Sequence, residues 1–307
     1  NRKTTNDRVQ QIATATFEQR LNERLSYFVK GHINDWDTRY SRVNNTADGG
    51  TVVRNRDDYW GFTDWGMQAE GKAELEGGHV LVFGSDNQWF KGQDDVLIID
   101  NNKAEAHALY SQLRPQIDAL PDWHPSIGLR HETMSGGDSA TVGMLTSLYD
   151  LNANWALRGQ YGSAYKLPNA EQLFVNEPGD EIGNRNLKPE KSRNAELGLD
   201  YKGLLADREF SASVTLFKRK ITDLITLDDS HWVNGQGQIQ VRGFEADAKL
   251  ALNQQWSLQA DMTRNLTESR AGVTLNDVPS FFARSRVGFE SQNRLWGAGA
   301  AIRYIHD

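Results

Sequence analysis

The sequence predicts an all-β fold, a meander of antiparallel strands that forms part of a transmembrane β-barrel. Two observations lead to this prediction. About fourteen stretches alternate apolar and polar residues with a period of two, the pattern of a strand with one apolar and one polar face. The connections between them are short and long in turn, as in outer-membrane barrels with short periplasmic turns and longer extracellular loops. A soluble β-sandwich has no reason to place every long connection at one end.

The predicted strands follow one another without a helical segment. They cover residues 8–19, 24–36, 59–75, 79–91, 103–117, 123–132, 140–151, 155–165, 193–202, 209–224, 238–251, 256–267, 280–290 and 294–305. The stretch Lys103–Arg114 also has the composition of a helix. It is read as a strand because no helical period extends for long anywhere in the chain.

The apolar face of each strand is read from its alternation. In 193–202, Leu197, Leu199 and Tyr201 oppose Glu196 and Asp200. In 140–151 the same rule predicts an apolar face formed by Val142, Met144 and Leu148. Charged residues recur on the opposite parity, where a packed core could not hold them because desolvating each charge costs several kcal/mol. A wide barrel would place them in its lumen.

The lengths of the connections predict how the strands are oriented across the membrane. The long ones cover 37–58, 92–102, 133–139, 166–192, 225–237 and 268–279, which are therefore predicted to be extracellular. Trp155, Tyr201, Trp256 and Trp296 lie beside short turns on the apolar parity. Aromatic residues are enriched at the two membrane interfaces, so these side chains predict the periplasmic girdle.

The composition and the motifs of the sequence disfavour several classes of function. The net charge of −7 and the pI of about 5.6 disfavour nucleic acid as a partner. Cysteine is absent, which removes disulfides and thiolate chemistry. The mean hydropathy of −0.64 suits a barrel, in which only alternate residues face lipid. The sequence has no GxSxG, HExxH or P-loop motif, so no enzymatic activity and no resident cofactor are predicted.

The longest connection between strands, 166–192, carries two short motifs, the first of which begins at Tyr165 at the end of the preceding strand. Tyr165-Lys166-Leu167-Pro168 is followed by Glu171-Gln172-Leu173-Phe174, and Asn186-Leu187-Lys188-Pro189-Glu190 leads into the next strand. Further along are Gly243-Phe244-Glu245 and Val278-Pro279. In order and spacing these features resemble the β-barrel of TonB-dependent outer-membrane receptors. The family's aromatic-Arg-Ala is replaced here by Tyr165-Lys166-Leu167, and Arg185 stands where the second motif usually begins Asn-Pro.

The resemblance implies a barrel of 22 strands closed by an N-terminal plug, an outer-membrane location and active transport energised by the TonB complex. Residues 1–307 would then be an incomplete barrel, with about 14 of the 22 strands and without the plug, the early strands and the last strands. The family takes up scarce nutrients, most often ferric siderophores. Residues 169–185 contain no histidine, which makes haem a less favoured cargo. A passive porin-like channel and a soluble carbohydrate-binding β-protein remain alternatives.

Candidate ligand contacts follow from the predicted extracellular loops, above all from the loop tip 176–185. They are Tyr165, Gln172, Phe174, Asn176, Glu177, Asp180, Glu181, Arg185 and Trp232. The motif residues Tyr165, Lys166, Pro168, Asn186, Leu187, Pro189, Glu190, Gly243 and Glu245 are expected to shape the barrel mouth. Aromatic and basic loop residues (Trp60, Trp89, Arg54 and Arg56) suit an anionic aromatic chelate through cation–π contacts and charge pairing. Asp94, Asp95 and Asp100, or Asp228 and Asp229, offer oxygen ligands for calcium, but their spacing matches no defined calcium loop, and no metal site is assigned.

Overall fold

A computed structural model describes residues 2–95, 97–135, 139–177, 179–270 and 278–306. Fourteen strands form one antiparallel sheet in which each strand pairs with the next along the chain. They are β1 (Arg2–Arg20), β2 (Leu25–Asn45), β3 (Thr51–Glu74), β4 (Val80–Asp94), β5 (Ile99–Arg114), β6 (Trp123–Met134), β7 (Ser139–Asp150), β8 (Trp155–Lys166), β11 (Glu190–Leu205), β12 (Arg208–Thr222), β15 (Gln238–Ala251), β16 (Trp256–Arg270), β17 (Phe281–Glu290) and β18 (Gly297–His306).

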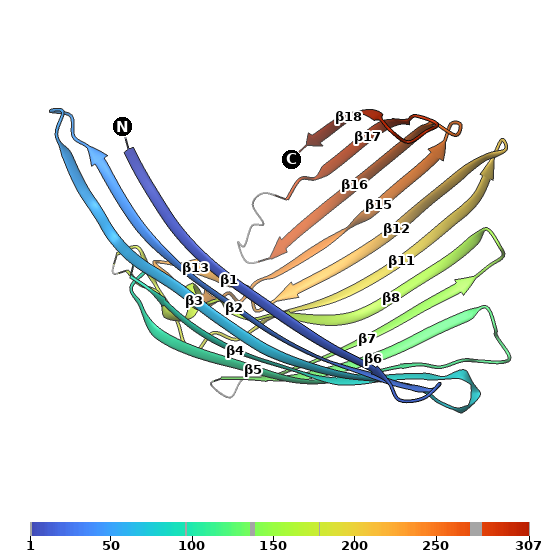
Figure 1. Cartoon of the computed structure of the whole chain (residues 1–307), viewed down its shortest axis with the longest axis horizontal. Coiled ribbons are helices and arrows are strands. Elements are labelled where there is room, and N and C mark those ends of the chain that lie inside the picture. The colour runs from blue at the N-terminus through green and yellow to red at the C-terminus, as the bar shows by residue number, and fades with distance from the viewer. Residues whose placement is uncertain (1, 96, 136–138, 178, 271–277, 307) are drawn as a thin grey trace.

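The sheet is an open trough, with β1 and β18 at its two edges (Figure 1). The short turns gather at the right of the view and the long loops at the left. The predicted meander of fourteen strands is confirmed, and Lys103–Arg114 lies within strand β5. The predicted connections 37–58 and 92–102 were too long: β2 and β3 leave only 46–50 between them, and β4 and β5 leave only 95–98. No helix among the described residues is long and apolar enough to cross a membrane.

Smaller elements lie in the connections, where none was predicted. They are η1 (Glu76–Gly78) in a short turn, α1 (Ala170–Phe174), β9 (Asn176–Glu177) and β10 (Glu181–Ile182) between β8 and β11, and the hairpin β13 (Ile225–Asp228) and β14 (His231–Asn234) between β12 and β15. The long connections are therefore partly folded.

The cross-strand register places large apolar side chains on one continuous face. Leu145 is opposite Tyr161, which is opposite Ala195, and Leu199 is opposite Leu157. Leu145 and Tyr161 are 52% and 55% exposed, as are many similar side chains of the same parity. Exposed apolar patches of this extent mark contact with a partner or a membrane. We call this the outward face.

The prediction for β7 was wrong. Met144 pairs with Gly162 and Leu148 with Arg158, which puts the predicted apolar set Val142, Met144 and Leu148 on the polar side. Leu145 belongs to the outward face instead. Both parities of this strand carry apolar residues, so alternation alone could not assign its faces; only the register with β8 does.

The opposite, inward face carries the charges in pairs. Arg158 Nε and Nη2 donate to Asp200 at 2.5 and 3.0 Å, and Arg130 Nη2 lies 2.5 Å from Glu132. Arg284 Nη2 is 2.8 Å from Asp261. Ion pairing of this kind lowers the desolvation penalty of charges that crowd together, as they do on this face of a curved sheet.

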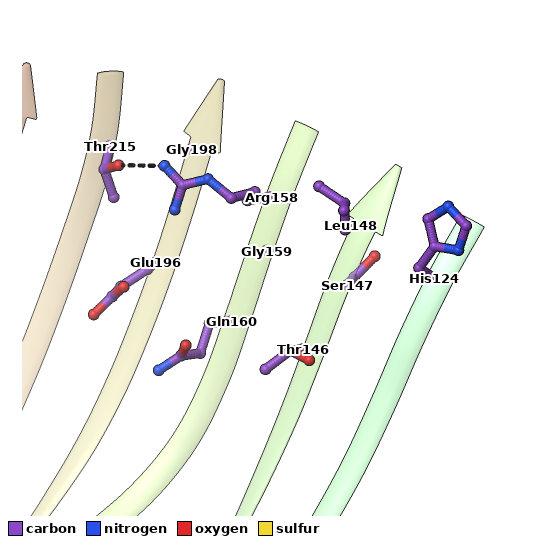
Figure 2. Close-up of a pocket in the computed structure, with 10 residues that line it drawn as sticks. All are labelled: His124, Thr146, Ser147, Leu148, Arg158, Gly159, Gln160, Glu196, Gly198 and Thr215. Carbon is purple, nitrogen blue, oxygen red and sulfur yellow. Dashed lines mark hydrogen bonds between the residues drawn. The ribbon is translucent and has the colours of Figure 1, made fainter. Parts of the chain in front are cut away.

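A polar hollow of about 210 Å³ lies on the inward face toward the short turns. Its lining includes His124, Gln160, Glu196 and Arg158 (Figure 2). Arg158 crosses β11 to donate to Thr215 Oγ1 at 3.3 Å. Gly198 leaves room for this crossing, because a Cβ there would lie 2.9 Å from Arg158 Nη2 and the guanidinium would have to shift.

Outward aromatic residues form two rows. At the short-turn end, Trp155 packs on Tyr201 with ring centroids 4.8 Å apart, and Trp256 packs on Phe289 at 4.8 Å. Trp65 and Trp89 stack at 4.0 Å farther along the strands. Trp65 precedes the end of β3 at Glu74 by nine residues, which is about 23 Å along the barrel axis for a strand tilted by about 40°. The separation matches an apolar band of about 25 Å.

Candidate functional site

The two central long loops fold together into one unit at the mouth of the trough. Strands β13, β14, β10 and β9 form a second, four-stranded sheet in that order. Strand β10 belongs to loop 167–189 and pairs in parallel with β14 of loop 223–237, with Ile182 opposite His231. We call loops 167–189 and 223–237, with their sheet, the rim assembly. It also reaches β5, because Asn176 N donates to Leu97 O at 3.2 Å beside the start of that strand.

Two asparagines join the loops. Asn234 Oδ1 accepts from Lys188 N at 2.7 Å, and Asn234 Nδ2 donates to Lys188 O at 2.8 Å and to Asp223 O at 2.9 Å. Asn184 Nδ2 donates to Trp232 O at 3.0 Å. Each side-chain amide bonds to backbone groups of the loops that have no partner in a strand. Buried backbone N–H and C=O groups need such partners.

A small apolar core lies beneath these bonds. Leu187 and Val175 are each 2% exposed, and Ile239 at the start of β15 is 0% exposed. Leu224 and Ile225 of the neighbouring loop are also buried. Burying side chains of this size contributes about 1.5–3 kcal/mol each, which gives the rim assembly a stability of its own.

Helix α1 begins with a capping box. Asn169 Oδ1 accepts from Gln172 N at 2.8 Å, and Gln172 Oε1 accepts from Asn169 N at 2.9 Å. Gln172 is only 7% exposed. At the other end, the Arg185 guanidinium lies 4.9 Å from the Phe174 ring centroid, a cation–π contact.

Acidic side chains meet at the same end of the molecule. Desolvation raises the pKa of Glu171, and the nearby charge of Glu181 and a hydrogen bond to it raise it further. Smaller contributions come from Asp94 and Glu177. Two close carboxylates cannot both ionise freely, so the charged form of Glu171 is disfavoured relative to a free carboxyl group.

An aromatic wall lies on the inward face of β2–β4, on the parity opposite to Trp65. It consists of Trp36, Tyr40, Trp60, Phe62 and Phe90, whose neighbouring ring centroids are 6.1–6.4 Å apart. Trp60 precedes Glu74 by fourteen residues, or about 36 Å along the axis. The wall therefore lies above the apolar band, at the long-loop end.

Cationic groups accompany the wall. The Arg8 guanidinium lies 4.6 Å from the Trp36 ring centroid. Arg42 Nε and Trp60 Nε1 are buried, and neither has a hydrogen-bond partner among the described residues. Unpaired buried donors are rare in folded proteins and call for an explanation. A ligand that accepts hydrogen bonds would satisfy them.

Comparison with known proteins identifies the family to which this chain belongs. The profile of the TonB-dependent receptor-like β-barrel matches residues 1–307. The chain is a member of the TonB-dependent receptor family. Its strands therefore belong to an outer-membrane barrel, and its outward face is the face that contacts lipid.

Individual relatives differ in what they carry. The vitamin B12 transporter of Vibrio cholerae is 29% identical over 131 residues, which is 42% of this chain and 20% of that protein. The siderophore receptor PirA of Pseudomonas aeruginosa superposes with a TM-score of 0.68 at 17% identity over 97% of this chain and 60% of that one. A copper transporter, OprC, gives 0.78 at 16% identity over 96% of this chain and 51% of that one. The chain thus spans about half the length of such receptors.

The family motifs have local structural roles in this TonB-dependent receptor chain. Leu187 fills the core of the rim assembly, and Pro189 is buried just before β11. Lys166 Nζ lies 3.6 Å from Glu190, whose Oε1 accepts from Ile225 N at 3.0 Å. These contacts are local to the rim and agree with the expectation that the motifs shape the barrel mouth.

Two further motif positions lie at the strands. A Cβ at Gly243 would lie 1.8 Å from Arg264 O and 2.9 Å from the Phe217 ring, so only glycine fits between β12 and β16. Pro168 lies between β8 and α1. Glu245 is exposed on the inward parity, opposite Thr215 and Thr263.

The structure brings most of the candidate ligand contacts into the rim assembly. Trp232 has a buried Nε1 without a partner among the described residues. Asp180 is exposed, and Asn176 and Glu177 form β9 opposite β10. Tyr165 is the second-last residue of β8 and hydrogen-bonds Glu132 and Arg130. Ligand contact at these residues stays a prediction.

Other candidates fall elsewhere. Trp89 pairs with Trp65 on the outward face, so the expectation that it contacts a chelate is wrong. No cluster of three metal-ligating side chains occurs in the described part of the chain, and the Asp100 side chain lies outside it. The inward Trp36, Tyr40, Phe62 and Phe90 were missed, because a strand pattern does not show which aromatic residues meet across strands.

Proposed function

We propose that the intact protein is an active-transport receptor that takes up a ferric siderophore of the anionic aromatic class, energised through TonB. The observation that carries the proposal is the aromatic wall with Arg8 and Arg42 beside it. Aromatic faces and guanidinium groups together bind flat, anionic ligands through stacking, cation–π contacts and charge-assisted hydrogen bonds.

The position of the wall supports this role. It lies on the inward face at the long-loop end, where a ligand arriving from outside would first meet the barrel. The acidic groups Glu171, Glu177 and Glu181 of the rim assembly would repel an anion. The proposal therefore assigns the first contact to the wall, and the rim assembly closes one side of the entrance.

Uptake by whole cells tests the proposal. The full-length gene is expressed in a strain without its own catecholate receptors, and import of radioactive iron from ferric enterobactin is measured with and without TonB. We expect TonB-dependent import that falls at least about fivefold in Trp60→Ala, because a buried aromatic contact contributes about 1 kcal/mol or more. Trp65→Ala is the matched control, since Trp65 lies in the same strand but faces lipid.

Cobalamin is the second candidate, favoured by the similarity to a vitamin B12 transporter. Import of labelled vitamin B12 is measured in the same strains. B12 import without iron import would replace the first proposal by this one. Ion conductance that needs neither TonB nor a plug would favour a passive channel and contradict both.

A further inference from the structure

The outward face is hollowed at one place near the short turns. A hollow of about 610 Å³ is bounded mainly by apolar side chains, among them Pro115, Ile117, Trp123, Ile127, Leu145 and Tyr161. The volume lies within the range of small-molecule binding sites, about 300–1,000 Å³. We call it the outward groove.

The register explains why the surface is hollow here. Pro125 is opposite Ser147, which is opposite Gly159. A Cβ at Gly159 would meet no atom within 4 Å. The short side chains of this row therefore form the floor of the groove, and the larger side chains around them form its walls. Trp123 Nε1 donates to Ser147 Oγ at 2.8 Å, which fixes the indole at one side of the groove.

The far wall comes from the turn between β5 and β6, which is held in place. Gln116 N donates to His79 Nδ1 at 2.9 Å, and Leu120 N donates to Ile117 O at 2.9 Å. Trp123 N donates to Leu120 O at 3.0 Å. Pro115 and Ile117 are therefore positioned over the groove by bonds that do not depend on an occupant.

Water does not suit this groove. Of its polar lining residues, Trp123 and Ser147 are on the outward parity, and Trp123 Nε1 already bonds to Ser147 Oγ. The remaining polar residues are on the inward parity of the same strands; they are Ser126, Thr146, Gln160 and Glu196. An ordered water needs two to four polar partners. The groove is continuous with the outward face, which contacts lipid. An acyl chain from the surrounding leaflet is apolar, flexible and already adjacent.

The turn that supplies Pro115 and Ile117 to the groove has an acidic character. Asp118 and Asp122 are exposed in turn 115–122, which contains no lysine or arginine. Arg114 Nη2 donates to Gln112 at 2.9 Å, and His124 faces Asp150 at 3.2 Å. These carboxylates favour a headgroup with an ammonium over one with a net negative charge.

We propose that the outward groove holds one acyl chain of a phosphatidylethanolamine molecule from the periplasmic leaflet, with its ammonium near Asp118 and Asp122. The chain fills a gap in the apolar belt that the row of small residues leaves. The proposal rests on the barrel's membrane location and not on its cargo.

Native mass spectrometry of the full-length protein tests the proposal. The protein is refolded in vesicles of 1-palmitoyl-2-oleoyl phosphatidylethanolamine, phosphatidylglycerol or an equal mixture, extracted in mild detergent and weighed. Gly159→Leu places a leucine in the groove at a position where its Cβ meets no atom within 4 Å, and Ala260→Leu adds the same leucine to the outward face at exposed Ala260, on β16. Heat-modified migration on gels confirms that each barrel is folded.

We expect one retained phospholipid in the wild type and in Ala260→Leu, and at least about fivefold less in Gly159→Leu, because the buried methylenes no longer fit. From the mixture, phosphatidylethanolamine should be retained about threefold over phosphatidylglycerol, since exposed charges contribute little. If Gly159→Leu does not fold, Ile117→Ser removes a wall in the turn and should lower retention likewise.

Equal retention in the wild type and the groove variants would overturn the proposal. So would a preference for phosphatidylglycerol, or a groove occupied by lipopolysaccharide, detergent or a polypeptide when the protein is isolated from cells.

Discussion

Asn234 is the residue whose loss should separate the two loops of the rim assembly. Replacing it by alanine removes three hydrogen bonds, of 2.7, 2.8 and 2.9 Å, to Lys188 and Asp223. At about 1 kcal/mol each, the loss is about 3 kcal/mol. Asn234→Asp keeps the acceptor for Lys188 N but loses both bonds that the amide nitrogen donates, so its loss should be about 2 kcal/mol.

Hydrogen exchange of the full-length protein in detergent measures this loss. The amides of Ile182 and Gly235, which donate to Ser230 O and Leu224 O, should exchange about 100-fold faster in Asn234→Ala, because 1.4 kcal/mol corresponds to a factor of ten. Asn265→Ala is the control: it removes a single 2.9 Å bond to Pro279 O in another loop. Unchanged exchange at Ile182 and Gly235 would refute the idea that Asn234 couples the loops.

Three further predictions concern single positions. Gly243→Ala should lower the yield of folded barrel on refolding, since its Cβ would overlap Arg264 O; refolding as efficient as that of the wild type would contradict this. Leu187→Ala should lower the stability of the rim assembly by about 2–5 kcal/mol, seen as faster proteolysis in loop 167–189 with an unchanged barrel. The raised pKa of Glu171 means that the folded rim assembly binds a proton more tightly than the open loop. The exchange protection of the rim assembly should therefore increase as pH falls through that pKa toward the ordinary value of 4.5, and Glu171→Gln should remove this dependence without lowering protection at neutral pH.

The strands could be predicted because the sequence of each strand contains a local signal that does not depend on the rest of the chain. A period of two over ten or more residues, bounded by turn residues, determines a strand such as β15 without reference to its neighbours. The faces are harder to predict. In β7 both parities hold apolar residues, and only pairing with Arg158 and Tyr161 shows that Leu148 is inward and Leu145 outward.

The loop elements depend on contacts that are distant in sequence. The parallel pairing of Ile182 with His231 and the bonds of Asn234 to Lys188 join segments about fifty residues apart, and no local pattern encodes them. The Asn169–Gln172 capping box was visible in principle, because an Asn followed three residues later by Gln is a helix-start signal. The aromatic wall needed the register of β2, β3 and β4 as well as their sequences.

The central claim is that the inward aromatic wall receives the ligand, and a binding titration tests it most directly. Quenching of tryptophan fluorescence by ferric enterobactin is measured with the purified full-length wild type, Trp60→Ala and Trp65→Ala. We predict that the dissociation constant rises about 5- to 30-fold in Trp60→Ala and stays within about twofold in Trp65→Ala. Equal affinity in all three proteins, or a greater loss in Trp65→Ala, would contradict it.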